Sequence, residues 1–416
     1  MPQEEYDKRK RKQEEKMASL SERSEQKRYE SMKKKKRIIR ITLAIFIVVA
    51  VVSSVLFYVF FQMNRTYGGY EVINEFERKD SVGAQYLWNN EKLVKYSKDG
   101  SVGMKIDGSK IWDVSYELKN PKAVACGDYV AIADIGEKEI WVFDGSEKGT
   151  CIETDAPIVQ VAVANQGVVA AVLQNNQEAQ INIYDPYDLN QQCKVQITTS
   201  TDSDGYPVSI ALSKDGQKLV TSYVNIVNGV IENSVNFYNF QGNWQDSENR
   251  MAGADLMGQN IVADLQFMTD DIVCAYMKQE IKLYRFRDKF EEIKDIKIDN
   301  AIKSVCNNSE YVALVVENAD KTDKPYIVKV YDTNGDLKLE KEIDYEYDTV
   351  KIENDELIFY SSTGARILRF RGSEKLNCTF DTNVSYFFAV GSSDKYILID
   401  GETVKQIALE GRVKGE

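Results

Sequence analysis

Carboxylate side chains stand in close pairs at several places in the sequence, as in Asp270-Asp271, Glu291-Glu292 and Asp344 with Glu346. Two carboxylates held about 5–10 Å apart are the machinery of glycoside hydrolysis. Spacing along a chain of strands does not bring such groups together, and the chain carries 65 acidic residues in all. A solvated surface explains each pair, so we predict no catalytic residue among them.

Three further motifs resemble ligand sites but depart from the required spacing. Thr201-Asp202-Ser203-Asp204-Gly205 begins like a calcium loop, yet its glycine follows the second acid directly and no glutamate closes a twelve-residue loop. Ser97-Lys98-Asp99-Gly100 and Ser213-Lys214-Asp215-Gly216 resemble sialidase Asp boxes, but they lack the residue between Asp and Gly and the later Trp. We interpret the first motif as a polar turn between repeats and the others as hairpin turns, and we predict no metal ligand.

Histidine is absent from the chain, which removes the commonest general base and the commonest neutral metal ligand. No phosphate loop, dinucleotide fingerprint or Gly-x-Ser-x-Gly elbow is found either. The sequence therefore predicts no cofactor and no cofactor-binding residue, and an enzyme is the less favoured class. Trp244, Tyr206 and Tyr187 fall in expected loops, where they are candidates for a binding face without an assigned role.

The six cysteines show none of the short spacings that bind metals. Most stand among apolar residues, which indicates buried thiols, while an even number also permits disulfides, with Cys126 and Cys151 as the nearest plausible pair. Their positions are 126, 151, 193, 274, 306 and 378.

One stretch is long and apolar enough to cross a membrane. Ile41–Phe61 contains no charged residue, and at about 1.5 Å per residue a helix of this length covers a hydrocarbon core of roughly 30 Å. The basic cluster Lys33–Arg37 precedes it, so the positive-inside rule places the amino terminus in the cytoplasm and the rest outside. A cleavable signal peptide is the alternative, but its apolar core is shorter and small residues follow it, whereas Phe60-Phe61-Gln62-Met63 is bulky.

The predicted organisation is a basic cytoplasmic tail, helical or disordered, over 1–37, a transmembrane helix over 38–61, a linker over 62–69 with a Gly68-Gly69 hinge, and an extracytoplasmic domain over 70–416. The net charge of -12 is unevenly distributed, because 15 basic and 8 acidic residues lie in the first forty positions. The tail is thus suited to anionic lipid headgroups. The acidic remainder disfavours nucleic acid as a partner.

The outer domain consists of repeated strand patterns with alternating apolar residues. Third strands end in an aromatic residue and Asp, or a looser version of this pair, and second strands are rich in Val, Ile and Ala. The third strands are Ile140–Asp144, Ile181–Asp185, Val235–Asn239, Ile281–Arg285, Val328–Asp332 and Ile367–Phe370. The second strands include Tyr129–Ala133, Val168–Val172, Tyr311–Val315 and Glu356–Tyr360.

Units of about four short strands begin near residues 82, 122, 158, 208, 262, 301, 349 and 384. This period predicts an all-β β-propeller of eight blades, or seven if one weak unit is misread, with a pair of β-sandwiches as the alternative. The last unit lacks a fourth strand, which Tyr70–Arg78 would supply to close the ring. The longest units are expected to hold loop-like insertions, including Asn243 to Gly258.

Ile210-Ala211-Leu212-Ser213-Lys214-Asp215-Gly216-Gln217-Lys218-Leu219-Val220 resembles the strand-turn-strand of WD40-like and quinoprotein-like propeller repeats. The whole layout of basic tail, single span, diglycine and acidic propeller resembles a family of single-pass, membrane-anchored propeller-like proteins of low-GC Gram-positive bacteria. This resemblance implies a fold and a location, and it brings no activity.

The sequence therefore favours a non-enzymatic binding or scaffold protein of the cell envelope. It is expected in the plasma membrane and would recognise an envelope protein or a wall-associated glycan through propeller loops. The alternative is an extracytoplasmic propeller enzyme, either a carboxylate-dependent glycan hydrolase or a quinone-cofactor dehydrogenase.

Overall fold

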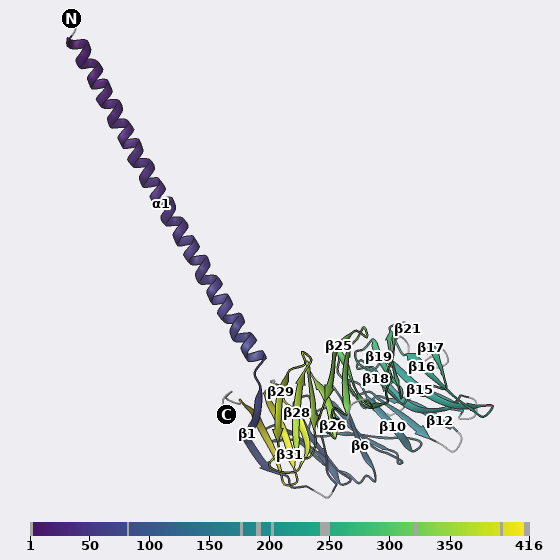
Figure 1. The fold of residues 1–416 in the computed structure, drawn as a ribbon. Coiled ribbons are helices and arrows are strands. Elements are labelled where there is room, and N and C mark those ends of the chain that lie inside the picture. Colours follow the sequence, from purple (N-terminus) through teal and green to yellow (C-terminus); the bar gives the residue numbers. More distant parts are fainter. Residues whose placement is uncertain are drawn as a thin grey trace. The chain divides into compact units, whose positions relative to one another are not determined.

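A computed structural model describes residues 3–80, 83–174, 178–188, 193–200, 204–241, 250–319, 323–391 and 394–411 (Figure 1). The chain divides into two compact units, 1–65 and 66–416. The first contains one long α-helix, α1 (Gln3–Met63), and the described residues of the second form 32 strands.

Helix α1 contains a segment, Lys27–Tyr58, whose length and composition are sufficient to cross a membrane. None of its most apolar part is buried against protein. The hydroxyl of Thr42 donates to the carbonyl oxygen of Ile38, at 3.1 Å, so this polar side chain is satisfied within the helix.

The second unit is built from antiparallel groups of four strands, which we call blades 1 to 8. The first four blades are blade 1, β2 (Gln85–Asn89), β3 (Lys92–Tyr96), β4 (Gly100–Lys105) and β5 (Lys110–Ser115); blade 2, β6 (Pro121–Cys126), β7 (Tyr129–Asp134), β8 (Glu139–Phe143) and β9 (Thr150–Glu153); blade 3, β10 (Ile158–Val163), β11 (Val169–Gln174), β12 (Glu178–Tyr184) and β13 (Cys193–Ser200); and blade 4, β14 (Tyr206–Leu212), β15 (Lys218–Val227), β16 (Val230–Asn239) and β17 (Met251–Gly258).

The remaining blades follow the same order. They are blade 5, β18 (Asp264–Phe267), β19 (Ile272–Tyr276), β20 (Glu280–Phe286) and β21 (Phe290–Lys297); blade 6, β22 (Ile302–Asn307), β23 (Tyr311–Glu317), β24 (Tyr326–Asp332) and β25 (Leu337–Ile343); blade 7, β26 (Thr349–Glu353), β27 (Glu356–Tyr360), β28 (Gly364–Arg369) and β29 (Glu374–Thr379); and blade 8, β30 (Val384–Ala389), β31 (Lys395–Asp400), β32 (Thr403–Gly411) and β1 (Tyr67–Glu77).

The first strands of neighbouring blades contact one another, for example β10 with β14 and β22 with β26, so these strands lie innermost in the ring. The β-propeller predicted from the repeats is confirmed, with eight blades. Their first strands start at 85, 121, 158, 206, 264, 302, 349 and 384, within three residues of every predicted start. The local alternation of apolar residues and the turns between strands determine these positions.

Strand β1 closes the ring. It pairs antiparallel with β32 from Tyr67 opposite Gly411 to Glu77 opposite Thr403, and a parallel bridge from Tyr67 to Leu376 joins blade 8 to blade 7 in one eight-stranded sheet. The predicted closing strand is confirmed, but it begins at Tyr67, so Gly68 and Gly69 lie inside β1 and not in a linker. Pairing with β32 draws these glycines into the sheet.

One predicted loop is partly wrong. Met251–Gly258, within the expected insertion, forms β17 and pairs with β16. Its two glycines and two alanines give little intrinsic preference for a strand, and the pairing with β16 decides its conformation. The preceding residues 242–249, with Trp244, lie outside the described part of the chain.

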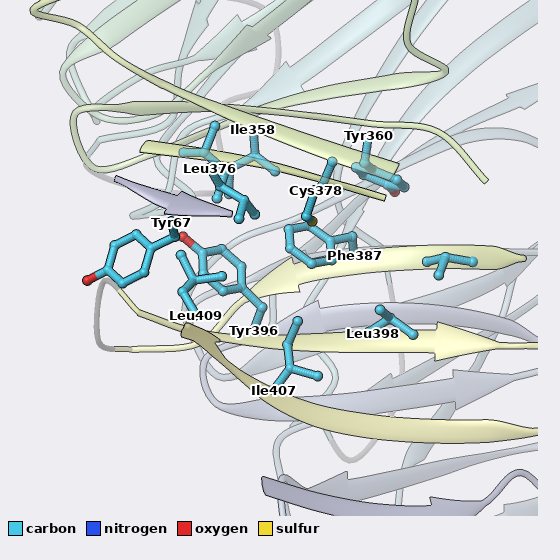
Figure 2. Packing of buried hydrophobic residues seen from close by; sticks show 13 residues of the cluster. Tyr67, Ile358, Tyr360, Leu376, Cys378, Phe387, Tyr396, Leu398, Ile407 and Leu409 are labelled. Carbon is cyan, nitrogen blue, oxygen red and sulfur yellow. The ribbon is translucent and has the colours of Figure 1, made fainter. Parts of the chain in front are cut away.

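The apolar core lies between adjacent blades. Between blades 7 and 8, Figure 2 shows Tyr67 of β1 beside Leu409 and Tyr396, with Leu376 of β29 above them. The aromatic rings of Phe387 and Tyr396 stack at 4.9 Å in the same cluster. Burial of these side chains, at about 1.5–3 kcal/mol each, links the closing strand to the stability of the ring.

Candidate binding sites on the propeller

The propeller has two faces with different connections. Turns between the first and second strands and between the third and fourth strands of a blade lie on one face, and the other turns and the links between blades lie on the opposite face. Because β1 is the fourth strand of blade 8, the chain enters the propeller at Tyr67 on the first of these faces. We call this the entry face and the opposite one the far face.

Polar contacts join neighbouring turns around the entry face. Gln166 Nε2 of blade 3 donates to the carbonyl oxygen of Asp215 in blade 4, at 2.7 Å. The amide of Asp215 in turn donates to Asp270 of blade 5, at 2.8 Å, and Lys218 binds Asp271 at 2.5 Å. The predicted hairpin turns at 97–100 and 213–216 are confirmed, and the second of them connects blades.

A cavity of about 300 Å³ opens on the entry face where blades 7, 8 and 1 meet, and we call it the closure pocket. It takes residues from the first-to-second-strand turns of all three blades and from the strands beside them. Its lining residues are Trp88, Asn90, Glu91, Glu353, Asn354, Glu356, Ala389, Val390, Gly391 and Tyr396.

The closure pocket is acidic. Three glutamates line it and no lysine or arginine does. Glu356 accepts an ion pair from Lys375 at 2.7 Å, whereas no basic nitrogen of the described chain lies within 4.0 Å of the carboxylates of Glu91 or Glu353. Burial raises the pKa of Glu353, and the positive charge of Lys351 on the same strand offsets only part of this effect.

Backbone strain is concentrated at this pocket. Asn90, Glu91 and Asn354 have positive φ angles of 43°, 63° and 52°, in a region that residues other than glycine seldom adopt. Only one other non-glycine residue of the described chain does so, Asn228. Tight turns between the first and second strands account for this conformation. These turns place residues 90, 91 and 354 at the pocket.

Beneath the pocket, Lys375 of β29 is 2% exposed. Its ammonium group binds Glu356 and also donates to the hydroxyl of Tyr396 at 3.3 Å. Arg369 lies 3.9 Å from the other carboxylate oxygen of Glu356. This buried network joins blades 7 and 8 at the point where the chain enters the ring.

The far face carries a protruding hairpin. Pairing of β15 with β14 ends at Val224 and pairing of β16 with β17 ends at Asn233, yet β15 and β16 stay paired as far as Val227 opposite Val230. We call residues 225–232 the arm. Asn228-Gly229 turns its tip with φ angles of 53° and 79°, as expected for a type I′ hairpin.

The arm exposes apolar side chains to solvent. Ile226 is 68% exposed, and Ile231, directly opposite it, is 45% exposed. Val227 and Val230 at the tip are 39% and 42% exposed. The arm carries a single charged residue, Glu232, and no proline, so it lacks most of the devices that protect free strand edges.

The acidic pairs singled out in the sequence serve separate contacts. Asp270 and Asp271 bind the turn of blade 4. Glu292 binds Lys282 at 3.3 Å, and Glu346 accepts from the hydroxyl of Tyr326 at 2.7 Å. In the described part of the chain no group of three or more acidic or cysteine side chains is placed to hold a metal ion.

The other candidate residues lie apart from both sites. In the motif at 201–205, residues 201–203 lie outside the described chain, and Asp204 accepts from the amide of Ser200 in the link between blades 3 and 4. Tyr206 donates to Gln174 at 3.1 Å. Tyr187 donates to Asp144 of blade 2 at 3.1 Å, so it serves contact between blades.

All six cysteines are free thiols that are buried or half-buried. Burial raises the pKa of Cys306 and of Cys274 to about 12 in each case. Cys126 and Cys151 lie on β6 and β9, the first and fourth strands of one blade. At about 4.8 Å per strand spacing they are roughly 14 Å apart, too far for a disulfide.

The residues of the closure pocket were not singled out in the sequence. They come from three segments, near 88–91, 353–356 and 389–396, which only ring closure brings together. The available signal was weak: Trp88-Asn89-Asn90-Glu91 and Glu353-Asn354-Asp355-Glu356 place acids and amides in tight turns. The Asn228-Gly229 turn of the arm was readable as a hairpin signal, but its extension beyond the sheet was not.

The fold is that of the β-propellers. Residues 63–409 match a family model described as "Family of unknown function (DUF5711)". The chain belongs to this family. No sequence among the curated proteins matches this chain.

Solved structures that resemble the chain are also propellers. BamB from Moraxella catarrhalis superposes with a TM-score of 0.53 at 9% identity, covering 82% of this chain and 100% of its own. The WD40 domain of Neurospora crassa Pan2 superposes with a TM-score of 0.42 at 11% identity, covering 71% of this chain and 91% of its own. Hsv2 of Kluyveromyces lactis superposes with a TM-score of 0.45 at 11% identity, covering 75% of this chain and 98% of its own. At 9% identity the likeness to BamB is one of fold alone.

Proposed function

We propose that this protein is a binding or scaffold protein of the cell envelope. Ile41–Phe61 anchors it in the plasma membrane, the tail over 1–37 lies in the cytoplasm, and the propeller lies outside. The apolar helix and the basic cluster Lys33–Arg37 support this orientation. An envelope protein is the partner that the exposed surface of the propeller fits best.

The exposed arm is the observation that carries the proposal. Four β-branched apolar side chains stand in solvent on a two-stranded projection whose outer backbone groups extend past the neighbouring strands. A partner segment that adds an extended strand would satisfy these backbone groups and cover the side chains of Ile226 and Ile231. The arm lies on the far face, away from the point where the chain enters the propeller.

A photo-crosslinking amino acid in place of Ile226 in the full chain tests the arm in living cells. We expect one discrete protein adduct from position 226 and none from Glu310, an exposed residue on the entry face. The double variant Ile226→Asp/Ile231→Asp should lower co-purification of that partner about tenfold and leave the melting temperature nearly unchanged, since both side chains are exposed. Identical adducts from both positions, or no adduct, would contradict the role of the arm.

Protease added to intact cells stripped of their wall tests the orientation. We expect digestion within 70–416 and a protected fragment that contains the tail and Ile41–Phe61, because only the outer domain is accessible. A cytoplasmic protein of the same cells serves as the control for lysis. If the propeller is digested only after lysis, both the location and the envelope partner are wrong.

A further inference from the structure

We propose that the closure pocket binds a primary ammonium group on a short aliphatic stem, such as an exposed lysine side chain of a peptide. This inference goes beyond the proposed function, because the pocket lies on the entry face and the arm lies on the far face. It rests on the size, charge and lining of the pocket.

The size fits one side chain and its neighbouring backbone. The cavity is about 300 Å³ and open on one side, at the lower end of the usual range for small-ligand pockets. Only one such group of a larger ligand would enter the cavity, and the rest of that ligand would lie outside it on the propeller surface.

The charge selects a cation. Lys375 already balances Glu356 at 2.7 Å. Glu91 and Glu353 are the lining carboxylates of the described chain with no basic nitrogen within 4.0 Å, and Lys351 offsets only part of the burial of Glu353. A side chain added at Gly391 would place its first carbon 3.9 Å from a carboxylate oxygen of Glu91, so this carboxylate of blade 1 faces the backbone of blade 8. Burial disfavours the ionised form of Glu353, and a cation bound in the pocket would stabilise that form.

The remaining walls suit an aliphatic stem beside an ammonium group. Trp88 contributes an indole ring, and Ala389 and Val390 contribute small apolar side chains. An ammonium group near an indole face gains cation–π attraction. Asn354 also lines the pocket, whereas the side-chain amide of Asn90 donates to Asp128 at 2.6 Å. No lysine or arginine lines the pocket, and Lys375 beneath it is already paired with Glu356, so the lining disfavours an anionic ligand.

The test uses the purified full chain in lipid nanodiscs and ligand-observed NMR titration with Nα-acetyl-lysine amide. We expect saturable binding, and at least about tenfold weaker binding of the same compound acetylated on its ε-nitrogen, since acetylation removes the charge. Glu353→Gln should weaken binding of the charged probe about tenfold, and the more exposed Glu91→Gln should also weaken it. Glu310→Gln, the same charge change on the same face outside the pocket, should leave it unchanged.

Three outcomes would overturn the proposal: no binding of the charged probe, equal binding of the charged and acetylated probes, or equal loss of affinity in the Glu310 and Glu353 variants. Tighter binding of N-acetylglucosamine than of the amine would replace it with a sugar site. Thermal unfolding of each variant separates a lost contact from a lost fold. Glu91→Gln keeps the test decisive because Glu91 is exposed, so its replacement should not unfold the propeller.

Discussion

A chain that begins at residue 78 should fail to form the closed ring, whereas one that begins at residue 64 should fold. The shorter chain lacks β1, which leaves the edge of β32 unpaired from Thr403 to Gly411. It also loses the buried side chain of Tyr67 and uncovers Ile407 and Leu409. At about 1.5–3 kcal/mol for each of these apolar side chains, the free energy of unfolding should fall by about 5 kcal/mol or more.

The measurement is thermal unfolding of both fragments, with gel filtration to detect association through the open edges. A synthetic peptide of residues 64–78 should restore the melting temperature of the shorter fragment, because it supplies the missing strand. A peptide of the same composition in scrambled order is the control. Equal melting temperatures for the two fragments would show that β1 does not hold the ring closed.

Lys375→Met should lower the free energy of unfolding by about 3 kcal/mol. The lysine is 2% exposed, and its removal leaves the carboxylate of Glu356 without the ammonium group at 2.7 Å. Tyr396 also loses the hydrogen bond that Lys375 donates to its hydroxyl. The loss should appear as a lower midpoint in urea unfolding with little change in slope.

Two comparisons isolate the charge. Lys375→Met combined with Glu356→Leu should recover part of the loss, because the carboxylate that lost its ammonium partner is also removed. The recovery is incomplete because Arg369, which lies 3.9 Å from the other carboxylate oxygen of Glu356, then loses that carboxylate. Lys110→Met removes a member of an exposed pair with Asp113, at 63% and 52% exposure, and should cost less than about 1 kcal/mol. If the single Lys375 variant costs no more than Lys110→Met, the buried pair does not stabilise the junction of blades 7 and 8.

Much of the fold was predictable because its signals are local. Strands such as Ile140–Asp144 alternate apolar and polar residues, and turns such as Lys214-Asp215-Gly216 carry the residues that accept positive φ. The missing strand of the last unit pointed to Tyr70–Arg78 as its complement. Where the local signal was weak, as in Met251–Gly258, prediction failed because pairing with β16, a tertiary contact, forms that strand.

The sequence by itself determined the apolar span at Ile41–Phe61, the eight blade starts and the strand that closes the ring. Only the tertiary structure decided the sites. The closure pocket joins Trp88, Glu353 and Ala389, which meet because the ring brings its two ends together. The arm projects because β14 and β17 end before β15 and β16 do, and strand lengths relative to their neighbours are settled by pairing between strands, which periodicity along the chain does not encode.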